Sequence, residues 1–454
     1  MTATVTGGTT ATGSTASAGR TAGPGGPAPG HARRRRIGLP RASTTPGKVR
    51  LIRAGLVILC LGWGALAALM VSQHASAAGD AVGTSEPLSL EAQQMYQSLA
   101  GADVLVSTGY LYGPTPPPDS RQRYLQDIAV ATADLKAVTA ASSGSGNSAV
   151  SDSLSTLSAN LPVYTGYVED GQIYNSLGYP AGGSFIEVAS EEMHLTLLPA
   201  ARNVYAQENA RLAKASAQAT GLPLAAVTLA AALVVGFLLY RSQRWLSRRT
   251  HRTLNVGLLL ASVAGMAALV WVVVALTGGR ADLLQATGHG SAPAETLAQA
   301  DIAALQARGD ETLNLISRTG DTDFQQDFRV AQGEFSTLLT AASTQSTPDA
   351  AGPTTAASHD ASSWFTVNQR AQQLDQAFRY GAETQLELGS AGTLFNRLES
   401  DLDGAIHADQ AVFASSATAG SDAFTGLEAG VIVLALAMAA GCAWGLSRRL
   451  AEYR

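Results

Sequence analysis

The chain has 454 residues, of which 46% are hydrophobic and 14% are charged, and its formal net charge at pH 7 is −5. It contains only two cysteines, so a framework of disulfide bonds is excluded as the source of its stability. Its domains must therefore be held together by apolar packing.

Residues 1–50 differ in composition from the rest of the chain. They are rich in Gly, Ala, Ser, Thr and Pro up to residue 30, and no acidic residue occurs before residue 54. This composition predicts a disordered, basic leader. Its arginines, among them Arg33 to Arg36, favour contact with anionic membrane lipid. Nucleic acid is not expected as a partner, because an apolar run follows closely.

Four apolar runs are long enough to cross a membrane as helices. They cover residues 54–72, 222–240, 255–276 and 427–446. Apart from Glu428 at the edge of the last run, none carries an ionisable side chain, which argues against a pump or a channel. A cleaved signal peptide is the alternative for the first run, because His74-Ala75-Ser76-Ala77 offers a cleavage site after it.

Small residues recur four apart in the third and fourth runs. They are Gly257, Ala261 and Gly265 in the third run and Ala437, Gly441 and Gly445 in the fourth. Such stripes let helix backbones approach closely in lipid. Fixed packing is one interpretation, and sliding along this seam during gating is the other.

Basic residues flank the runs on one side of the membrane. Short loops rich in Arg and Lys stay in the cytoplasm, so both termini, the loop 241–254 and the tail 447–454 are expected there. Residues 77–220 and 277–426 then lie outside, with formal charges of −8 and −12. These features predict a multi-pass protein of the cell membrane. The candidates for a cytoplasmic relay surface are the loop arginines Arg241, Arg244, Arg248, Arg249 and Arg252.

Both outer segments show a helical pattern. In the first, strong helix breakers at residues 113–118, 142–147 and 179–183 separate four helix-length stretches. Apolar residues recur at helical spacing between them, as in Tyr124, Ile128 and Leu135. This arrangement favours four antiparallel helices that begin and end at the membrane.

The second outer segment repeats the first at an offset of 200 residues. Matched pairs are Tyr124 with Phe324, Tyr164 with Trp364, and Leu198 with Leu398. A period this long indicates domain duplication. The predicted fold class is all-α: four transmembrane helices that carry two tandem extracytoplasmic four-helix bundles.

Motifs for catalysis are missing from the sequence. The seven histidines form no pair at metal-ligand spacing, and there is no G-x-S-x-G elbow or phosphate-binding loop. The cytoplasmic loops are too short to fold as a kinase or a cyclase. We expect neither enzymatic activity nor a cofactor or metal.

The turns farthest from the membrane are the first candidates for partner binding, because exposed tyrosines and arginines are favoured at interfaces. The candidates are Tyr110, Tyr112, Asp119, Arg121, Arg123, Tyr179, Arg318, Asp321, Asp323 and Tyr380. The alternative is that these side chains are solvated helix ends or parts of the core.

A second candidate is the charged stretch Arg308, Asp310 and Glu311 within one predicted helix. Arg308 and Glu311 are three residues apart, so they can pair on the helix surface. A buried polar site inside the bundle is the functional alternative.

The architecture resembles the GlnX-type membrane sensors of actinobacteria. The local match is the stretch Ala307 to Arg318, which reads ARGDETLNLISR. The resemblance implies an external partner similar to the solute-binding lipoprotein GlnH, loaded with aspartate, glutamate or a related amino acid. It also implies a cytoplasmic partner similar to the Ser/Thr kinase PknG, or an adaptor. The sequence leaves a homodimer open.

The signalling hypothesis is mechanical. The first and fourth helices of each bundle are expected to continue into the membrane runs, with Pro199, Gly221 and Pro223 as the interruptions between Phe185 and Tyr240. Docking outside would shift these helices by an ångström or two. A static scaffold of an envelope or secretion complex is the alternative function.

Overall fold

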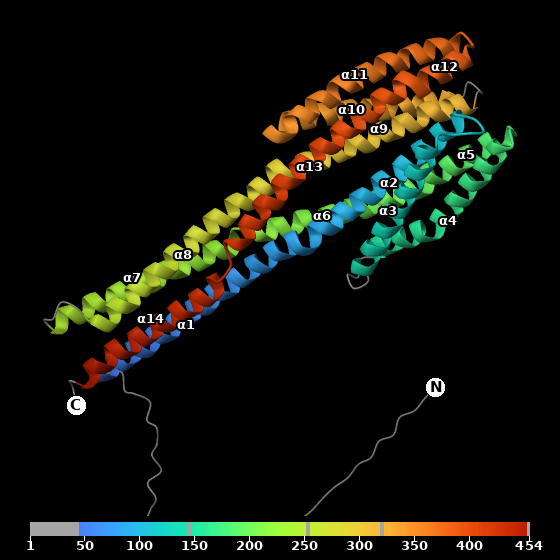
Figure 1. Ribbon diagram of the computed structural model, residues 1–454. Coiled ribbons are helices and arrows are strands. Elements are labelled where there is room, and N and C mark those ends of the chain that lie inside the picture. The colour runs from blue at the N-terminus through green and yellow to red at the C-terminus, as the bar shows by residue number, and fades with distance from the viewer. Residues whose placement is uncertain (1–44, 143–147, 251–254, 318–321, 452–454) are drawn as a thin grey trace, which may run out of the picture.

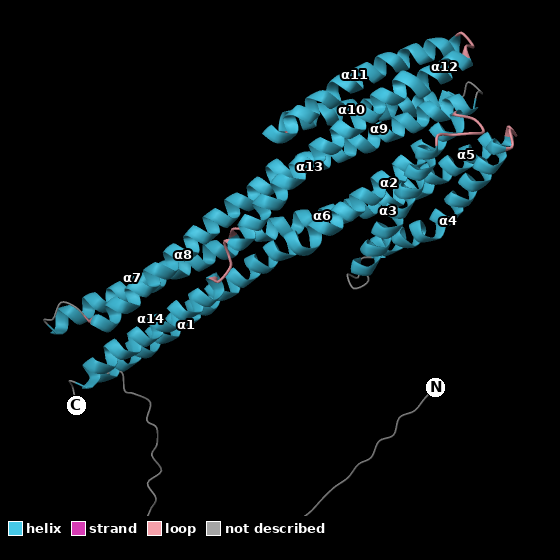
Figure 2. Cartoon of the chain, in the orientation of Figure 1, coloured by secondary structure: helices cyan, strands magenta, loops and turns pink. Residues whose placement is uncertain are grey.

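The computed structural model describes residues 45–142, 148–250, 255–317 and 322–451, and within these ranges it contains helices and turns but no strand (Figure 2). The predicted all-α fold class is confirmed. The described helices form one elongated body with the apolar helices at one end (Figure 1). The opposite end is called the distal end below.

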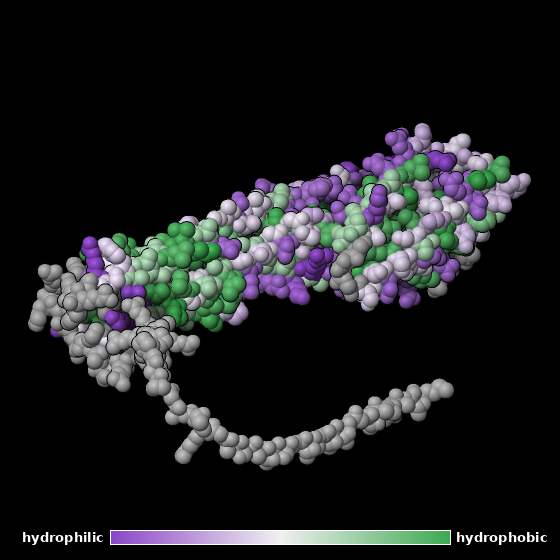
Figure 3. Space-filling view, turned by 90° about the horizontal axis from the view of Figure 1, so that it is seen from below, coloured by the Kyte–Doolittle hydropathy of each residue, from purple (hydrophilic) through white to green (hydrophobic). Residues whose placement is uncertain are grey.

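Four helices are long and apolar enough to cross a membrane. Their membrane-side parts are α1 (Thr45–Asp80), α7 (Pro223–Thr250), α8 (Val256–Ala286) and α14 (Leu427–Ala451). Figure 3 shows apolar residues gathered over this end of the molecule and polar residues over much of the rest. The chain therefore has the organisation of a multi-pass membrane protein.

Two groups of helices extend from the spans to the distal end. The first comprises a π-turn η1 (Ala81–Ser85), α2 (Glu86–Leu111), α3 (Pro118–Ser142), α4 (Ser148–Ser176), α5 (Ala181–Glu192), η2 (Met193–Leu197) and α6 (Leu198–Thr220). The second comprises η3 (Thr287–Ser291), α9 (Ala292–Ser317), α10 (Thr322–Gln345), α11 (Pro348–Gln376), α12 (Tyr380–Leu386), η4 (Glu387–Ala391) and α13 (Gly392–Asp422). Within each group the helices lie side by side (Figure 1).

The offset between corresponding helices changes along the chain. The helices α4 and α11 begin and end 200 residues apart, at Ser148–Ser176 and Pro348–Gln376. The π-turns η2 and η4, however, cover 193–197 and 387–391, so the constant offset is wrong for the fourth helix. The pairing of Leu198 with Leu398 is therefore incorrect: Leu198 follows η2 directly, whereas Gly392 is the residue that follows η4. Most of this change arises because α12 has 7 residues where α5 has 12.

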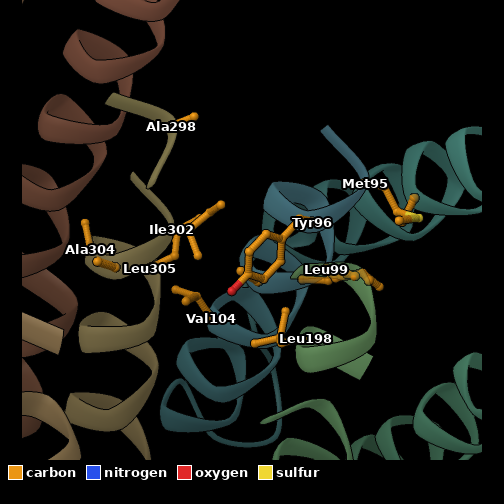
Figure 4. Packing of buried hydrophobic residues seen from close by; sticks show 14 of the residues in the cluster. Met95, Tyr96, Leu99, Val104, Leu198, Ala298, Ile302, Ala304 and Leu305 are labelled. Atoms are coloured by element: carbon orange, nitrogen blue, oxygen red, sulfur yellow. The ribbon is translucent and has the colours of Figure 1, made fainter. Parts of the chain in front are cut away.

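The two groups share one hydrophobic core. It runs from the inside of the first group, across α2 and α9, into the second group. Figure 4 shows Tyr96 and Val104 of α2 facing Ile302 and Leu305 of α9. Because burial of apolar area is the main favourable term in folding, the two groups stabilise each other.

The incoming helices, which lead from the first and third spans to the distal end, are continuous over this whole length. One runs from Thr45 to Leu111 through η1, and the other runs from Val256 to Ser317 through η3. Each π-turn adds a residue to the local turn without ending the helix. The expectation of unbroken first helices agrees with these bounds.

The outgoing helices are broken where they meet the spans, unlike the incoming ones. The helix α6 ends at Thr220, and Gly221 is extended, with φ −62° and ψ 136°. A turn at 423–426 separates α13 from α14, with Gly426 at φ +75°. Pro199 causes no break, because it lies in the first turn of α6 directly after η2, where no regular helical donor is needed.

Side chains of α1 and α8 contact the backbone carbonyl groups at the first break, between α6 and α7. A ring nitrogen of the buried His74, Nε2, lies 3.0 Å from the carbonyl oxygen of Gly221. Arg280 donates to the carbonyl oxygen of Thr220 at 2.9 Å. Arg280 thus satisfies a carbonyl that the end of a helix leaves without a partner, and His74 lies beside the next one. The break is thus a defined joint between α6 and α7.

The small-residue stripes of α8 and α14 face each other. A Cβ atom added to Gly257 would lie 2.4 Å from Cα of Gly445 and 2.6 Å from the carbonyl oxygen of Gly441. Both distances are far below a normal carbon contact. The two backbones therefore touch along this seam, which is the packing interpretation of the stripe.

We predict that Gly257→Val destabilises the span region by about 1–3 kcal/mol, because the side chain has no space without separation of α8 and α14. The measurement is thermal unfolding of the full chain in detergent. Gly62→Val on α1 is the matched control, since no atom lies within 4 Å of an added Cβ there. Equal unfolding temperatures for the two variants would contradict this packing.

Candidate functional site

The candidate partner-binding residues do not form one surface. Tyr112 and Tyr179 are exposed at the distal end, whereas Tyr110 is half-buried, with its hydroxyl against Gly183. Tyr380 is half-buried and packs edge-on against Phe378, which is 78% exposed and has φ 56°. Exposed aromatic side chains thus mark the tip of each helix group.

The charged candidates on α3 are exposed but lie in different surroundings. Arg121 lies 3.7 Å from Glu169 on the surface, and Asp119 is exposed beside the helix start. Arg123 lines a groove between the two helix groups instead. Arg318 and Asp321 lie outside the described residues, as does the side chain of Asp323.

Among the relay candidates, Arg241, Arg244 and Arg248 are exposed along the last turns of α7. Arg244 also donates to the hydroxyl of Tyr240 at 3.3 Å. Arg252 and the side chain of Arg249 lie outside the described residues.

The third candidate set lies inside the protein. Arg308 is 2% exposed, and Asp310 and Glu311 are also buried, so pairing of Arg308 with Glu311 on the helix surface is wrong. The reason is packing: α9 lies between α2, α10 and α13, and so has little free surface. The geometry is that of the buried polar site.

A network of hydrogen bonds surrounds Arg308 in the second helix group. Its guanidinium donates to a carboxylate oxygen of Glu311 at 2.5 Å, to the carboxylate of Glu387 and to the carbonyl oxygen of Glu387. Trp364 Nε1 and Asn368 Nδ2 also donate to Glu311. A buried cation with two carboxylates satisfies the rule that buried charges are paired.

Local backbone geometry brings Glu387 into this network. It is the first residue of the π-turn η4, and His194 is the second residue of the π-turn η2 in the first group. A π-turn shifts the side chains that face the core, and such turns are frequent at functional sites. A π-turn thus carries an ionisable side chain in each of the two groups of helices.

A second polar cluster lies where the two groups meet. Asp103 of α2 accepts a hydrogen bond from Ser190 at 2.7 Å, and His194 Nε2 lies 3.3 Å from the same carboxylate oxygen. Burial raises the pKa of Asp310 to about 7 against the lowering effect of His194; nearby Asp327 and Asp103 raise it further. The pKa of His194 is raised as well, because its attraction to Asp103 outweighs burial.

Direct hydrogen bonds between described side chains join the two groups. Gln97 donates to Asp301 at 3.1 Å, and Thr312 donates to the hydroxyl of Ser107 at 2.9 Å. Both join α2 to α9. The polar clusters and the shared core therefore meet along the same helix pair.

Sequence reasoning found Arg308, Asp310 and Glu311 but missed Asp103, Ser190, His194 and Glu387. A signal for Asp103 was present, because it lies four residues after the buried Leu99 and three before the buried Val106. An acid on a buried helical stripe indicates a buried polar partner. Glu387 gave no such signal, since η4 changes the helical register.

Comparison with known proteins gives one result for this region. Residues 77–217 match the family model of the actinobacterial sensor domain. No curated protein and no solved structure matches the chain. The matched residues run from the end of α1 into α6 and include Asp103 and His194. The match supports a sensing or signalling role and favours a non-enzymatic one.

Loss of Arg308 should lower the free energy of unfolding, because two buried carboxylates depend on it. We predict that Arg308→Met destabilises the full chain by about 3–5 kcal/mol, because it removes the buried positive charge that pairs with Glu311 and Glu387. Chemical unfolding in detergent measures the change. The control is Arg397→Met: this side chain is 60% exposed and lies 3.6 Å from Asp360, so its loss should cost at most about 1 kcal/mol. A smaller loss for Arg308→Met than for the control would be inconsistent with the network.

The interface cluster should make stability depend on pH. The folded-state pKa of Asp310 is about 7, above its ordinary value, so the folded state binds the proton more tightly than the unfolded state. Stability therefore rises as pH falls from 8 through 7, and the raised pKa of His194 acts in the same direction.

We accordingly expect the unfolding temperature of the wild-type chain to be higher at pH 6 than at pH 8. Asp310→Asn should raise the unfolding temperature at pH 8 and reduce this dependence. Asp152→Asn, an exposed change on α4, is the control and should leave both unaltered. A lower unfolding temperature for Asp310→Asn at pH 8 would show that the ionised carboxylate stabilises the fold.

Proposed function

We propose that the chain is a transmembrane sensor that transmits the state of an external partner to the cytoplasm by movement of its continuous helices. The observation that carries this proposal is the pair of unbroken helices, from Thr45 to Leu111 and from Val256 to Ser317. Each links the distal end to the membrane without a flexible segment. A helix that long moves as a rod, so a shift at one end reaches the other.

The joints in the outgoing helices give these rods freedom to move. The joint at Gly221 and the turn at 423–426 each separate an outer helix from its span. Phe424 at the second joint packs against Gly279 of α8 and lies 6.3 Å from the ring of His74 of α1. Both rods therefore contact a joint at the same level. A shift of an ångström or two along a rod is a known scale for such transitions.

The orientation and the partners follow from charge and from the resemblance to GlnX-type sensors. We place both termini and the loop 241–254 in the cytoplasm, where Arg241, Arg244 and Arg248 form a basic, exposed surface. The inner partner in this proposal is a Ser/Thr kinase similar to PknG, or an adaptor. The outer partner is a lipoprotein similar to GlnH that binds aspartate, glutamate or a related amino acid. The exposed aromatic residues at the distal tips supply a surface that suits protein recognition.

The test is co-purification of the full chain from its own cells, with and without added aspartate or glutamate, followed by mass spectrometry. We expect a solute-binding lipoprotein and a kinase or adaptor in amounts that depend on the amino acid. Tyr179→Ala combined with Phe378→Ala should reduce lipoprotein recovery at least tenfold, because it removes a strongly exposed aromatic side chain from each tip.

The matched control is Leu125→Ala combined with Ile173→Ala, which removes exposed apolar side chains outside the two tips' turns. This control variant should recover the lipoprotein as the wild-type chain does. Recovery of envelope or secretion components alone, unaffected by amino acid, would contradict the sensor and support the static scaffold.

A further inference from the structure

The first and last spans, α1 and α14, pack side by side (Figure 1). Each carries one cysteine, Cys60 on α1 and Cys442 on α14, and the sequence has no other. Both side chains are 0% exposed and belong to the hydrophobic core of the spans. The fold thus brings two cysteines from opposite ends of the chain into one core.

The two thiol groups face each other, and they form a side-chain hydrogen bond across the contact between α1 and α14. The backbones are close one turn farther along α1: a Cβ atom added to Gly64 would lie 3.7 Å from Cα of Ala435 and would overlap the Cβ atom of that residue. A disulfide bond needs Cα atoms that are roughly 4.4–6.8 Å apart. The spacing of these two helices therefore suits a disulfide bond between the facing cysteines.

An apolar cavity within the spans lies one helical turn from each cysteine. It has a volume of about 240 Å³, and its lining includes Trp63, three residues after Cys60, and Met438, four residues before Cys442. Residues three or four apart share a helix face. The lining also includes Met266, which is exposed on the outer surface of the spans. A small uncharged molecule that enters from the bilayer can therefore approach both thiols.

We propose that Cys60 and Cys442 form a reversible disulfide bond that fastens α1 to α14, with a peroxide as the oxidant. The first thiol attacks the O–O bond of hydrogen peroxide, its sulfur becomes a sulfenic acid, and one water leaves. The second thiol attacks that sulfur: the S–S bond forms, the S–O bond breaks, and the leaving hydroxide takes the thiol proton as a second water. Two electrons thus pass from the two sulfurs to the peroxide. An added dithiol reverses the bond by exchange.

The pairing of the cysteines is the feature that adds this chemistry. A buried cysteine by itself is a small apolar residue of a core. Here, however, the two cysteines of the whole chain meet in a single contact. Disulfide bonds inside cells are uncommon and are usually transient, catalytic or redox-sensing. A bond at this place is therefore expected to form and break with the supply of oxidant.

The bond would fasten one of the rods to a span that lies beyond a joint. The helix α1 continues through η1 into α2, whereas the turn at 423–426 separates α14 from α13. In the proposed function, the rod shifts relative to the outgoing spans. A disulfide bond between α1 and α14 would therefore hold the sensor in one state. This consequence rests on the proposed function, whereas formation of the bond does not.

The test uses the full chain in lipid nanodiscs, with a protease site inserted between residues 250 and 255 so that the two cysteines fall in different fragments. After exposure to hydrogen peroxide, the remaining thiols are blocked, and the protein is unfolded in dodecyl sulfate and cut. The fragments are then separated by electrophoresis without reductant. We expect the two fragments of the oxidised chain to stay linked and to separate when a dithiol is added.

Two variants serve as controls. Cys60→Ala removes one of the sulfurs and should abolish the linkage. Cys60→Ala combined with Ile58→Cys keeps one cysteine on each helix but moves the thiol of α1 to a position that is 70% exposed on the surface of the spans. This matched control should give at least about tenfold less linked product than the wild-type chain, because its sulfurs do not meet.

Three results would overturn the proposal: separate fragments from the oxidised wild-type chain, equal linkage in the matched control, or linkage only between two molecules, seen as a dimer before cutting. The chain without the inserted site gives a second readout. Its unfolding temperature should rise on oxidation, because a cross-link constrains the unfolded chain, and that of Cys60→Ala should not. Both measurements need no partner protein, so their failure is distinguishable from failure of lipoprotein or kinase recovery.

Discussion

The contact between α2 and α9 is the constraint on which the rest of the molecule depends. These two helices are continuous with the spans α1 and α8, and they also carry the shared hydrophobic core. A change in their relative position alters the core, the hydrogen bonds Gln97–Asp301 and Thr312–Ser107, and the interface cluster of Asp103, His194 and Asp310 together. Packed interfaces respond to such changes in discrete steps, because close-packed cores deform little.

Several buried polar groups lie at or beside this contact. The Arg308 network and the Asp103 cluster both include residues of α2 or α9. Buried polar groups are costly unless satisfied, and they favour arrangements in which every partner is in place. An interface of this kind is a suitable place to couple an external event to the position of a helix. In the proposed mechanism, the two joints at the membrane let the rods shift while the outgoing helices stay packed.

The distal tips present exposed aromatic residues, as protein-binding surfaces do. In the proposed mechanism, a partner bound at the tips acts on the position of α2 relative to α9.

The sequence by itself determined the four apolar helices, the all-α fold class and the close packing of the glycine stripes, because these depend on local hydrophobicity, periodicity and residue size. It also identified Arg308, Asp310 and Glu311 as an unusual set, but not whether they are buried. Only the tertiary structure decided that point, and it brought in Asp103, His194 and Glu387, which are far apart in the chain. The π-turns were also beyond the sequence, since they arise where the register of a long helix must adapt to its neighbours, whereas Gly221 of the first joint was among the interruptions that the sequence indicated.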